Sequence, residues 1–326
     1  MRVLITGGAG FIGSHLAEAC LTAGHEVYVI DDLSTGALEN IAHLLDDPDL
    51  SGRFFFHKAS ILDPDPLMEL VATCDLVYHL AAAVGVRYIL ENPLKSVRIN
   101  IQGTEKVLEL CSRFKKKVLI ASSSEVYGKH LHAPLTETDN IIYGPSSKFR
   151  WSYAASKLMD EFLALAYYRT TGLPVVIVRL FNTVGPRQTG AYGMVIPTLT
   201  AQALAGEPLT VYGDGTQTRT FTYVTDVVEA LSALMENPAA VGQIVNVGGV
   251  EEVSIAALAR RIVETTGSSS EVRLIPYEEA FPADFEDMQR RVPDIKKLEE
   301  LTGSRPKTDL AGILEKVAGY LRASGR

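Results

Sequence analysis

The sequence of 326 residues has few cysteines, and none of them stands in a metal-binding or disulfide pattern. Cys20, Cys74 and Cys111 are far apart, and an odd count without Cys-x-x-Cys spacing indicates reduced thiols in a core. We therefore expect no metal site and no disulfide. The N-terminal residues lead straight into a strand pattern, without the charged and apolar regions of a signal peptide, so a cytoplasmic protein is expected.

The sequence also lacks long apolar runs and blocks of positive charge. The apolar run at residues 75–84 is too short and too interrupted to span a bilayer. The net charge is −8 and no basic block exceeds residues 115–117, which excludes a nucleic-acid footprint. Neither a membrane nor a nucleic acid is an expected partner. The negative net charge does not exclude anionic small molecules as ligands, because local arginines and helix N-termini decide their binding more than total charge does.

The regular feature of the chain is an alternation of short β-branched runs with longer helical patterns. Strands are expected at residues 2–6, 26–30, 54–57, 76–80, 118–122 and 175–179, and helices at residues 11–23, 97–114 and 152–171. This alternation predicts an α/β fold, a doubly wound parallel (Rossmann) sheet with helices on both faces. In such sheets ligands bind beyond the carboxyl ends of the strands.

The second half predicts a smaller lobe that is interleaved with the sheet in sequence. Frequent glycines at residues 180–218 indicate a loop-rich segment over the site. We expect a cofactor-binding domain at residues 1–179, with residues 219–250 returning to its sheet through a strand at 243–249. Residues 180–218 and 251–326, with helices at 254–266 and 310–321, are expected to form the substrate lobe.

A glycine-rich turn between the first strand and the first helix predicts a dinucleotide site. Gly7, Gly10 and Gly13 allow the backbone to approach a pyrophosphate, which the helix N-terminus then stabilises. Asp31 ends the second strand, where a carboxylate accepts hydrogen bonds from a ribose 2′-hydroxyl and repels a 2′-phosphate, so NAD is the expected cofactor. The alternative is a structural turn beside a solvated aspartate. The predicted cofactor contacts in this region are Gly7, Gly10, Phe11, Ile12, Gly13, Asp31 and Asp32.

Tyr153 and Lys157 lie four residues apart at the start of a predicted helix, so both side chains project from one face. A nearby cation favours the phenolate, which makes tyrosine usable as a base near neutral pH. Alone, such a pair is usually part of an amphipathic surface. Together with the glycine-rich turn, it predicts oxidation of a hydroxyl by a bound dinucleotide.

The chain resembles the extended short-chain dehydrogenases/reductases that act on nucleotide sugars, over nearly its whole length. The resemblance rests on the glycine turn, Tyr-x-x-x-Lys and further motifs that begin at Tyr78, Ser122, Arg179, Gly185 and Arg219. It implies that Tyr153 is the acid/base at the sugar C4 hydroxyl, that Lys157 lowers its pKa and binds the nicotinamide ribose, and that Ser123 hydrogen-bonds the same hydroxyl.

The resemblance also implies the remaining ligand contacts. Many members of the family hold the adenine amine with an aspartate where this chain has Ser60, which can still accept that hydrogen bond. The further cofactor contacts implied are Ser60, Ile61, Leu80, Ala81, Ala82 and Asn100. The substrate contacts implied are Arg87, Tyr88, Asn182, Arg187, Tyr212 and Arg219.

Ser124 and Glu125 are expected to decide the reaction. In 4,6-dehydratases this motif is Thr-Asp-Glu, and here Ser124 replaces the acid that protonates the leaving hydroxyl. Ser-Ser-Glu is more similar to the Thr-Ser-Glu of UDP-glucuronate decarboxylases, which implies conversion of UDP-glucuronate to UDP-xylose, with Ser124, Glu125 and Arg219 holding the carboxylate. A UDP-sugar 4-epimerase, a 4,6-dehydratase and an NAD-sensing regulatory protein are the alternatives. Glu125 could also be a purely structural carboxylate.

The predicted helix at residues 152–171 carries Leu158, Phe162, Leu165 and Ala166 on one stripe. Members of the family pair such helices into a four-helix interface, which implies a homodimer. The same stripe could instead face the protein's own sheet, and the sequence does not separate these two arrangements.

Overall fold

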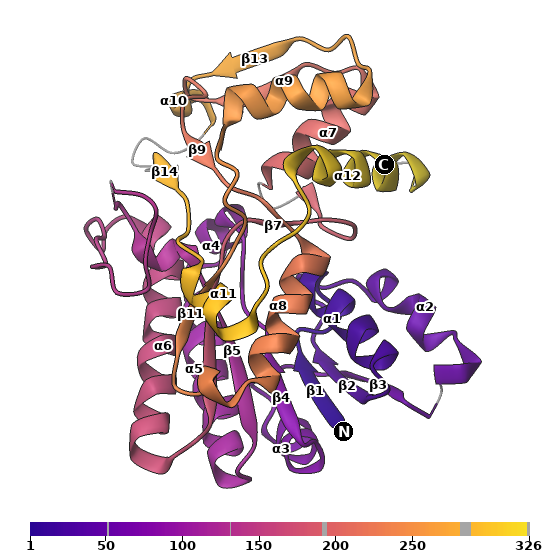
Figure 1. Cartoon of the computed structure of the whole chain (residues 1–326), viewed down its shortest axis with the longest axis vertical. Helices are drawn as coiled ribbons and strands as arrows, with labels where there is room; N and C mark the ends of the chain where they lie inside the picture. The colour runs from indigo at the N-terminus through magenta and orange to yellow at the C-terminus, as the bar shows by residue number, and fades with distance from the viewer. Residues whose placement is uncertain (51, 131, 191–193, 281–287, 325–326) are drawn as a thin grey trace.

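A seven-stranded parallel sheet forms the centre of the computed structural model, which describes residues 1–50, 52–130, 132–190, 194–280 and 288–324 (Figure 1). Its strand order is β11-β6-β5-β4-β1-β2-β3. The strands are β1 (Arg2–Thr6), β2 (Glu26–Asp31), β3 (Phe54–Lys58), β4 (Leu76–His79), β5 (Lys117–Ser123), β6 (Val175–Leu180) and β11 (Ile244–Val247). The predicted doubly wound parallel sheet is confirmed.

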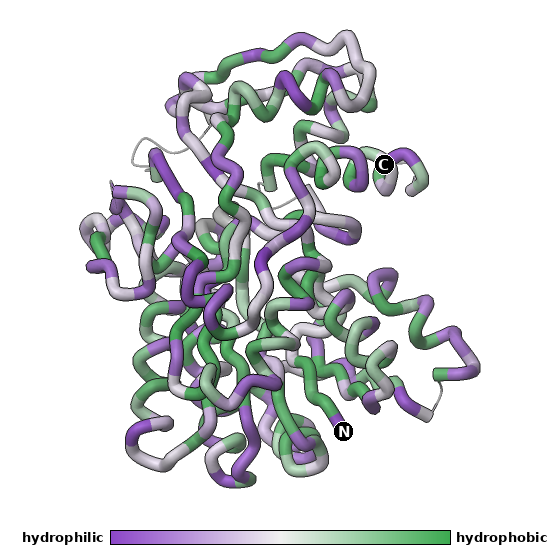
Figure 2. The backbone as a smooth tube through the Cα atoms, viewed as in Figure 1, coloured by the Kyte–Doolittle hydropathy of each residue, from purple (hydrophilic) through white to green (hydrophobic). Residues whose placement is uncertain are grey.

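Helices cover both faces of this sheet because successive strand residues point to opposite sides. Val3 and Ile5 of β1 pack with one group of helices and Leu4 packs with the other. The first group is α1 (Phe11–Thr22), α2 (Ala42–Leu45) and α8 (Val224–Glu236), and the second is α3 (Pro64–Thr73), α5 (Pro93–Arg113) and α6 (Ser152–Thr171). Strands buried on both faces are almost continuously hydrophobic, and Figure 2 shows hydrophobic residues concentrated along them.

The strand order places a topological switch point beside β1. The chain runs from β1 outward through β2 and β3, and then returns to β4 on the other side of β1. In open α/β sheets the crevice at this point is where ligands bind. The glycine turn follows β1, and the segment that begins with Leu80 follows β4, so both predicted cofactor segments meet there.

A smaller lobe lies beyond one end of the sheet and has a hydrophobic core of its own (Figure 1). Ile196, Leu258 and Leu314 represent its three main helices in that core. These helices are α7 (Val195–Ala205), α9 (Ile255–Thr266) and α12 (Leu310–Ala323), with strands β8 (Leu209–Tyr212), β9 (Thr218–Arg219), β12 (Val253–Ser254), β13 (Val272–Ile275) and β14 (Arg290–Arg291) and helix α10 (Tyr277–Ala280) around them. Two short parallel strands, β7 (Thr183–Val184) and β10 (Thr222–Tyr223), pair with one another between the two parts.

One segment differs from the predicted division into lobes. Ile295 and Leu298, at the start of α11 (Lys296–Thr302), pack into the main core beside α8 and β11 rather than into the lobe. Residues 292–302 therefore belong with the sheet by packing, although residues 251–326 were expected in the substrate lobe. The reason is packing, because α11 lies against both α8 and β11.

The cysteines are buried and unpaired, as the reduced-thiol prediction requires. Burial raises the pKa of Cys20 and of Cys74 to about 12, so neither thiol is reactive near neutral pH. Within the described residues, no helix combines the length and the apolar character needed to cross a bilayer.

Candidate active site

One continuous cavity of about 1280 Å³ opens at the carboxyl ends of the central strands. It runs from the glycine turn, past the end of β5 and the start of α6, to the arginines of the lobe. Single-ligand pockets are typically about 300–1,000 Å³, so this cavity has room for a dinucleotide and a second ligand together. The cavity contains these predicted site residues: Gly7, Gly10, Phe11, Ile12, Gly13, Asp31, Asp32, Ser60, Ile61, Leu80, Ala81, Ala82, Ser123, Ser124, Glu125, Tyr153, Lys157, Asn182, Arg187, Tyr212 and Arg219.

The glycine turn leaves no space for side chains at two of its positions. A Cβ atom on Gly13 would lie 2.2 Å from the carbonyl oxygen of Gly7, and one on Gly7 would lie 2.8 Å from the backbone nitrogen of Ala81. Gly7 also has a φ of +73°, which favours glycine. Helix α1 begins directly after this turn, so its free N–H groups face the cavity where a pyrophosphate would bind. These residues fit the predicted dinucleotide.

Asp31 stands at the cavity wall at the end of β2. Its carboxylate accepts hydrogen bonds from the backbone N–H groups of Ala9 at 3.0 Å and Leu33 at 2.8 Å. Burial raises the pKa of Asp31, and these backbone hydrogen bonds oppose that shift. The carboxylate is thus fixed in position, as the predicted contact to a ribose requires.

The predicted adenine end of the cavity is formed by Asp32, Ser60 and Ile61. The hydroxyl oxygen of Ser60 accepts a hydrogen bond from the Leu62 backbone N–H at 3.2 Å. One of its lone pairs is therefore used within the loop, while its hydrogen is available to a ligand acceptor. The second lone pair of the Ser60 hydroxyl is also available, so a hydrogen bond from the adenine amine to Ser60 stays a prediction.

Tyr153 lies in the first turn of α6, and Lys157 lies one turn later. The helix begins at Ser152, after the short 3-10 helix η4 (Phe149–Trp151), and ends at Gly172 in the left-handed conformation. Burial raises the pKa of Tyr153, whereas the Lys157 ammonium and a hydrogen bond with the Ser123 hydroxyl lower it. The predicted pair and the serine at the end of β5 therefore meet at one place in the cavity.

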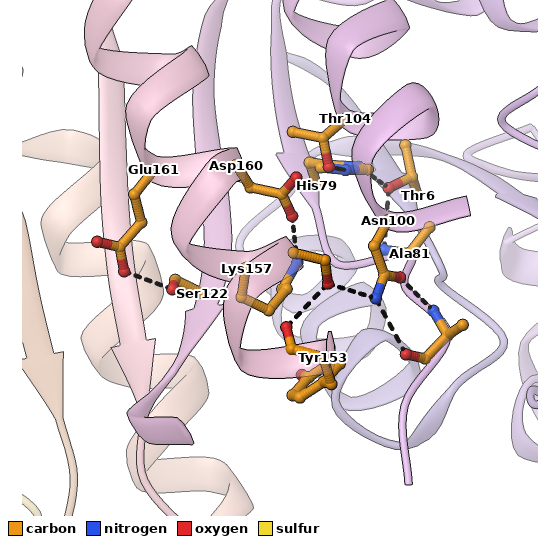
Figure 3. A network of polar contacts seen from close by, with 12 residues as sticks. Thr6, His79, Ala81, Asn100, Thr104, Ser122, Tyr153, Lys157, Asp160 and Glu161 are labelled. Carbon is orange, nitrogen blue, oxygen red and sulfur yellow. Dashed lines mark hydrogen bonds and ion pairs between the residues drawn. The ribbon is translucent and has the colours of Figure 1, made fainter. Parts of the chain in front are cut away.

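Asn100 does not line the cavity, although the resemblance implied a cofactor contact. Its side-chain oxygen accepts from the backbone N–H of Ala83 at 2.8 Å, and its amide donates to the Ser156 hydroxyl at 3.1 Å (Figure 3). It therefore fixes the segment after β4 against the catalytic helix from behind the cavity wall.

Glu125 has two positively charged partners. It lies in the 3-10 helix η3 (Ser124–Tyr127), and its carboxylate pairs with Arg150 of η4 at 2.6 Å and with Arg291 of β14. Burial alone would raise its pKa, but the two guanidiniums outweigh burial and lower the pKa of Glu125 to about 2. Glu125 is thus ionised at every pH of interest and is a poor proton acceptor.

A small sheet places two arginines side by side at the lobe end of the cavity. Strands β9 and β14 pair in parallel, with Arg291 directly opposite Arg219. Residues opposite one another in a sheet point to the same face, so both guanidiniums approach the cavity from one surface. Arg219 was predicted, and Arg291 was not.

The other predicted substrate residues fall into two groups. Asn182 lines the cavity, but its amide donates to the Thr220 carbonyl at 2.8 Å and its side-chain oxygen accepts from Arg291. Arg187 also lines the cavity and pairs with Glu18 of α1. Tyr212 lines it at the end of β8. Tyr88 does not line it, and the side chain of Arg87 lies outside the part of the chain that the structure describes.

Sequence reasoning missed Arg150, Arg291 and Asp160. Arg150 lies three residues before Tyr153, so its position close to the catalytic tyrosine was a usable local signal. Asp160 lies three residues after Lys157 and forms an ion pair with it at 3.0 Å. Nothing in the sequence around Arg291 indicates a site. In the described ranges, no three His, Cys, Asp or Glu side chains gather as a metal site would require.

A glycine turn at the switch point and a Tyr-x-x-x-Lys pair on the helix after β5 define an extended short-chain dehydrogenase/reductase. The chain belongs to the family described as GDP-mannose 4,6 dehydratase, whose model matches residues 4–317. The predicted family is thereby confirmed.

Three similar proteins, two decarboxylases and one epimerase, indicate the kind of reaction. The chain is 43% identical to the UDP-N-acetyl-alpha-D-glucosaminuronate decarboxylase of Bacillus cytotoxicus, over 98% of both chains. It is 37% identical to UDP-glucuronic acid decarboxylase 1 of Arabidopsis thaliana, over 99% of this chain and 70% of that protein. The UDP-glucuronic acid 4-epimerase of Bacillus cereus, solved with UDP-glucuronic acid and NAD, superimposes with a TM-score of 0.88 at 33% identity, over 99% of this chain and 100% of that one. These relatives confirm the expected class, an enzyme that modifies nucleotide sugars, and the expected cofactor, NAD.

Proposed function

We propose that this protein is an NAD-dependent decarboxylase of a UDP-hexuronate that works through a 4-keto sugar. The observation that carries the proposal is the cluster of Glu125 with Arg150 and Arg291 beside the catalytic tyrosine. Two guanidiniums and one carboxylate carry a net positive charge, and Arg219 adds another from the same small sheet. A buried positive site of this kind favours a substrate carboxylate.

In the proposed reaction Tyr153 accepts the proton of the C4 hydroxyl, with Ser123 hydrogen-bonded to the same hydroxyl and Lys157 favouring the phenolate. NAD, when bound in the cavity, would supply the hydride acceptor for oxidation at C4 and the hydride donor for the final reduction. The C4 ketone makes the C6 carboxylate part of a β-keto acid, which loses carbon dioxide with the ketone as electron sink. Arg219 and Arg291 orient the carboxylate before it leaves, and Ser124 hydrogen-bonds the same end of the sugar. C5 then takes up a proton from water at the end of the cavity that the arginines and Glu125 keep polar. Tyr153 returns its proton to the C4 oxygen when the ketone is reduced.

The alternatives receive different support. A 4,6-dehydratase needs a base at C5 and an acid at C6, and here the pKa of Glu125 is about 2 and the acid position is Ser124. A 4-epimerase acting on a UDP-hexuronate is the second candidate, because the epimerase of Bacillus cereus has the same fold and was solved with UDP-glucuronic acid, which also carries a carboxylate. Such an enzyme would have to hold the carboxylate without losing it.

Incubation of the purified protein with UDP-glucuronate, UDP-N-acetylglucosaminuronate and UDP-glucose tests the proposal. The expected result is loss of carbon dioxide from one or both uronates and no reaction with UDP-glucose, measured by product mass and NMR. A product of unchanged mass with inverted C4 would identify the 4-epimerase instead. The ratio of kcat/KM for the two uronates would name the sugar.

We further propose a homodimer built from α5 and α6. Phe162 of the predicted stripe is 61% exposed and therefore does not face the protein's own sheet, and the neighbouring Met159 is 46% exposed. Leu158 and Leu165 are half-buried, and Ala166 is exposed. Exposed apolar side chains in one patch support an interface.

Phe162→Glu is expected to convert the dimer to a monomer, because it places a charge in an apolar contact. Light scattering at micromolar concentration measures the mass. Leu274→Glu is the control, since Leu274 is 54% exposed but lies on β13 of the lobe. A wild-type protein of monomer mass would remove the dimer proposal.

A cytoplasmic location is also proposed. The three buried, unpaired cysteines support it, because reduced thiols are typical of that compartment.

A further inference from the structure

Asp160 is a buried carboxylate that touches the catalytic lysine. It lies on α6 three residues after Lys157, and its Oδ2 atom is 3.0 Å from the Lys157 ammonium. The side chains are 0% and 3% exposed, so water contributes nothing to holding this pair. Asp160 does not line the cavity and approaches Lys157 from the side of α5 (Figure 3).

A buried chain of hydrogen bonds runs from the cofactor turn to α5, beside Asp160. The Thr6 hydroxyl, directly before Gly7, lies 2.8 Å from Nδ1 of His79, and Nε2 of His79 lies 3.0 Å from the Thr104 hydroxyl. The chain connects the end of β1, the end of β4 and α5, as Figure 3 shows for Thr6, His79 and Thr104. Burial raises the pKa of Asp160, whereas Lys157 and the neighbouring Thr104 hydroxyl lower it.

His79 joins the two ends of this chain as a neutral imidazole. Burial lowers the pKa of His79 to about 3, so its ring is neutral and carries a single N–H. One ring nitrogen therefore donates and the other accepts. The Thr6 oxygen also accepts a hydrogen bond from the Ala81 backbone N–H at 3.2 Å. The chain thus fixes the packing of β1, β4 and α5 beside the Lys157–Asp160 pair.

We propose that Asp160 is a positioning residue, which anchors the Lys157 ammonium and, as its buried counter-ion, limits how strongly that ammonium promotes ionisation of Tyr153. The proposal rests on the proposed function only in taking Tyr153 as the base at the C4 hydroxyl. Without this carboxylate, the buried ammonium depends more on the Tyr153 phenolate as its counter-ion, which favours ionisation of the tyrosine.

The surrounding charges agree with this role. Burial alone would lower the pKa of Lys157, but Asp160 and Tyr153 outweigh it and raise the pKa. For Tyr153, burial raises the pKa, Lys157 lowers it, and Asp160 is one of the groups that raise it. The titratable and charged groups around the pair are His79 from β4, Tyr153 and Glu161 from α6, and Glu125 from η3.

Asp160→Asn tests the proposal, because the amide oxygen can still accept from Lys157 while the negative charge is removed. The rate rises with pH as Tyr153 ionises, and removal of a nearby negative charge lowers the pKa of Tyr153. The acid limb of the kcat/KM profile is therefore expected to move to lower pH by about one unit. Asp160→Leu, which also removes the acceptor, is expected to lower kcat about ten-fold or more because Lys157 loses its anchor. A purely structural Asp160 would leave the limb unchanged in every folded variant, and an unchanged or raised limb overturns the proposal.

A second readout does not depend on turnover. Tyrosinate absorbance of the holoenzyme, measured against Tyr153→Phe as the blank, is expected to show the same downward shift in Asp160→Asn. If the asparagine variant does not fold, Asp160→Ser supplies the same comparison, since it also removes the charge. Failure of the proposed function looks different: wild-type protein would then leave both UDP-hexuronates unchanged, whereas failure of this proposal leaves an active wild type and an unmoved tyrosine titration.

Discussion

Tyr153→Phe is expected to lower kcat about a thousand-fold, because the phenylalanine variant keeps the ring but has no group to accept the C4 proton. The variant should still fold and bind both ligands, since Tyr153 contributes its hydroxyl to the cavity rather than to the core. Single-turnover formation of reduced nicotinamide, followed by its absorbance, measures the affected step directly. KM should change little.

Tyr167→Phe is the matched control. Tyr167 lies on the same helix and is half-buried in the core on the α3, α5 and α6 side of the sheet, away from the cavity. Loss of its hydroxyl should therefore leave kcat within about two-fold. If Tyr153→Phe retained wild-type rates of hydride transfer, the assignment of the base would be wrong, and with it the first step of the reaction.

Glu125→Gln is expected to lower the free energy of unfolding by about 3 kcal/mol and to abolish decarboxylation. The amide leaves Arg150 and Arg291 with uncompensated buried charge, and their guanidiniums lose the group that holds them in place. Denaturant unfolding measures the first effect, and product analysis with a UDP-hexuronate measures the second.

The lowered pKa of Glu125 also predicts how this destabilisation depends on pH. The folded-state pKa of Glu125 is lowered to about 2, so its contribution is fully present above the ordinary pKa of a glutamate and is lost progressively as the pH falls from there to about 2. The destabilisation should therefore be the same at weakly acidic and weakly alkaline pH. Glu264→Gln, at an exposed position of α9, should change the unfolding free energy by less than about 0.5 kcal/mol. A folded Glu125→Gln protein that decarboxylates at the wild-type rate would falsify the proposed mechanism.

The sheet and the cofactor turn could be predicted from the sequence because both depend on local pattern. Buried strands of a parallel sheet are recognisable as short apolar runs, and the glycines mark the point where β1 meets α1. The Tyr153 and Lys157 pair follows from helical spacing. Each of these features is decided within about twenty residues of chain.

The charge state at the lobe end of the cavity, around Glu125, could not be predicted from the sequence, because it depends on contacts between distant segments. Arg291 reaches Glu125 across 166 residues, through the pairing of two-residue strands that have no sequence signature. Arg150 lies close to Tyr153 in sequence, but the direction of its side chain is set by the 3-10 turn of η4. Asp160 has helical spacing from Lys157, yet its burial follows from the packing of α5 against α6. Sequence alone therefore singled out Glu125, which lines the cavity, without revealing that it is an ion-paired carboxylate.

The pairing of β9 with β14 has a consequence for how this site can change. Because Arg219 and Arg291 are opposite neighbours in one small sheet, a shift of either strand displaces both guanidiniums, and with Arg291 also the carboxylate of Glu125 and the amide of Asn182. The proposed recognition of a carboxylate is thus a property of one connected unit rather than of separable side chains. Substitution of single residues should easily destroy it, whereas a new preference at the sugar C6 position would require the whole unit to be rebuilt.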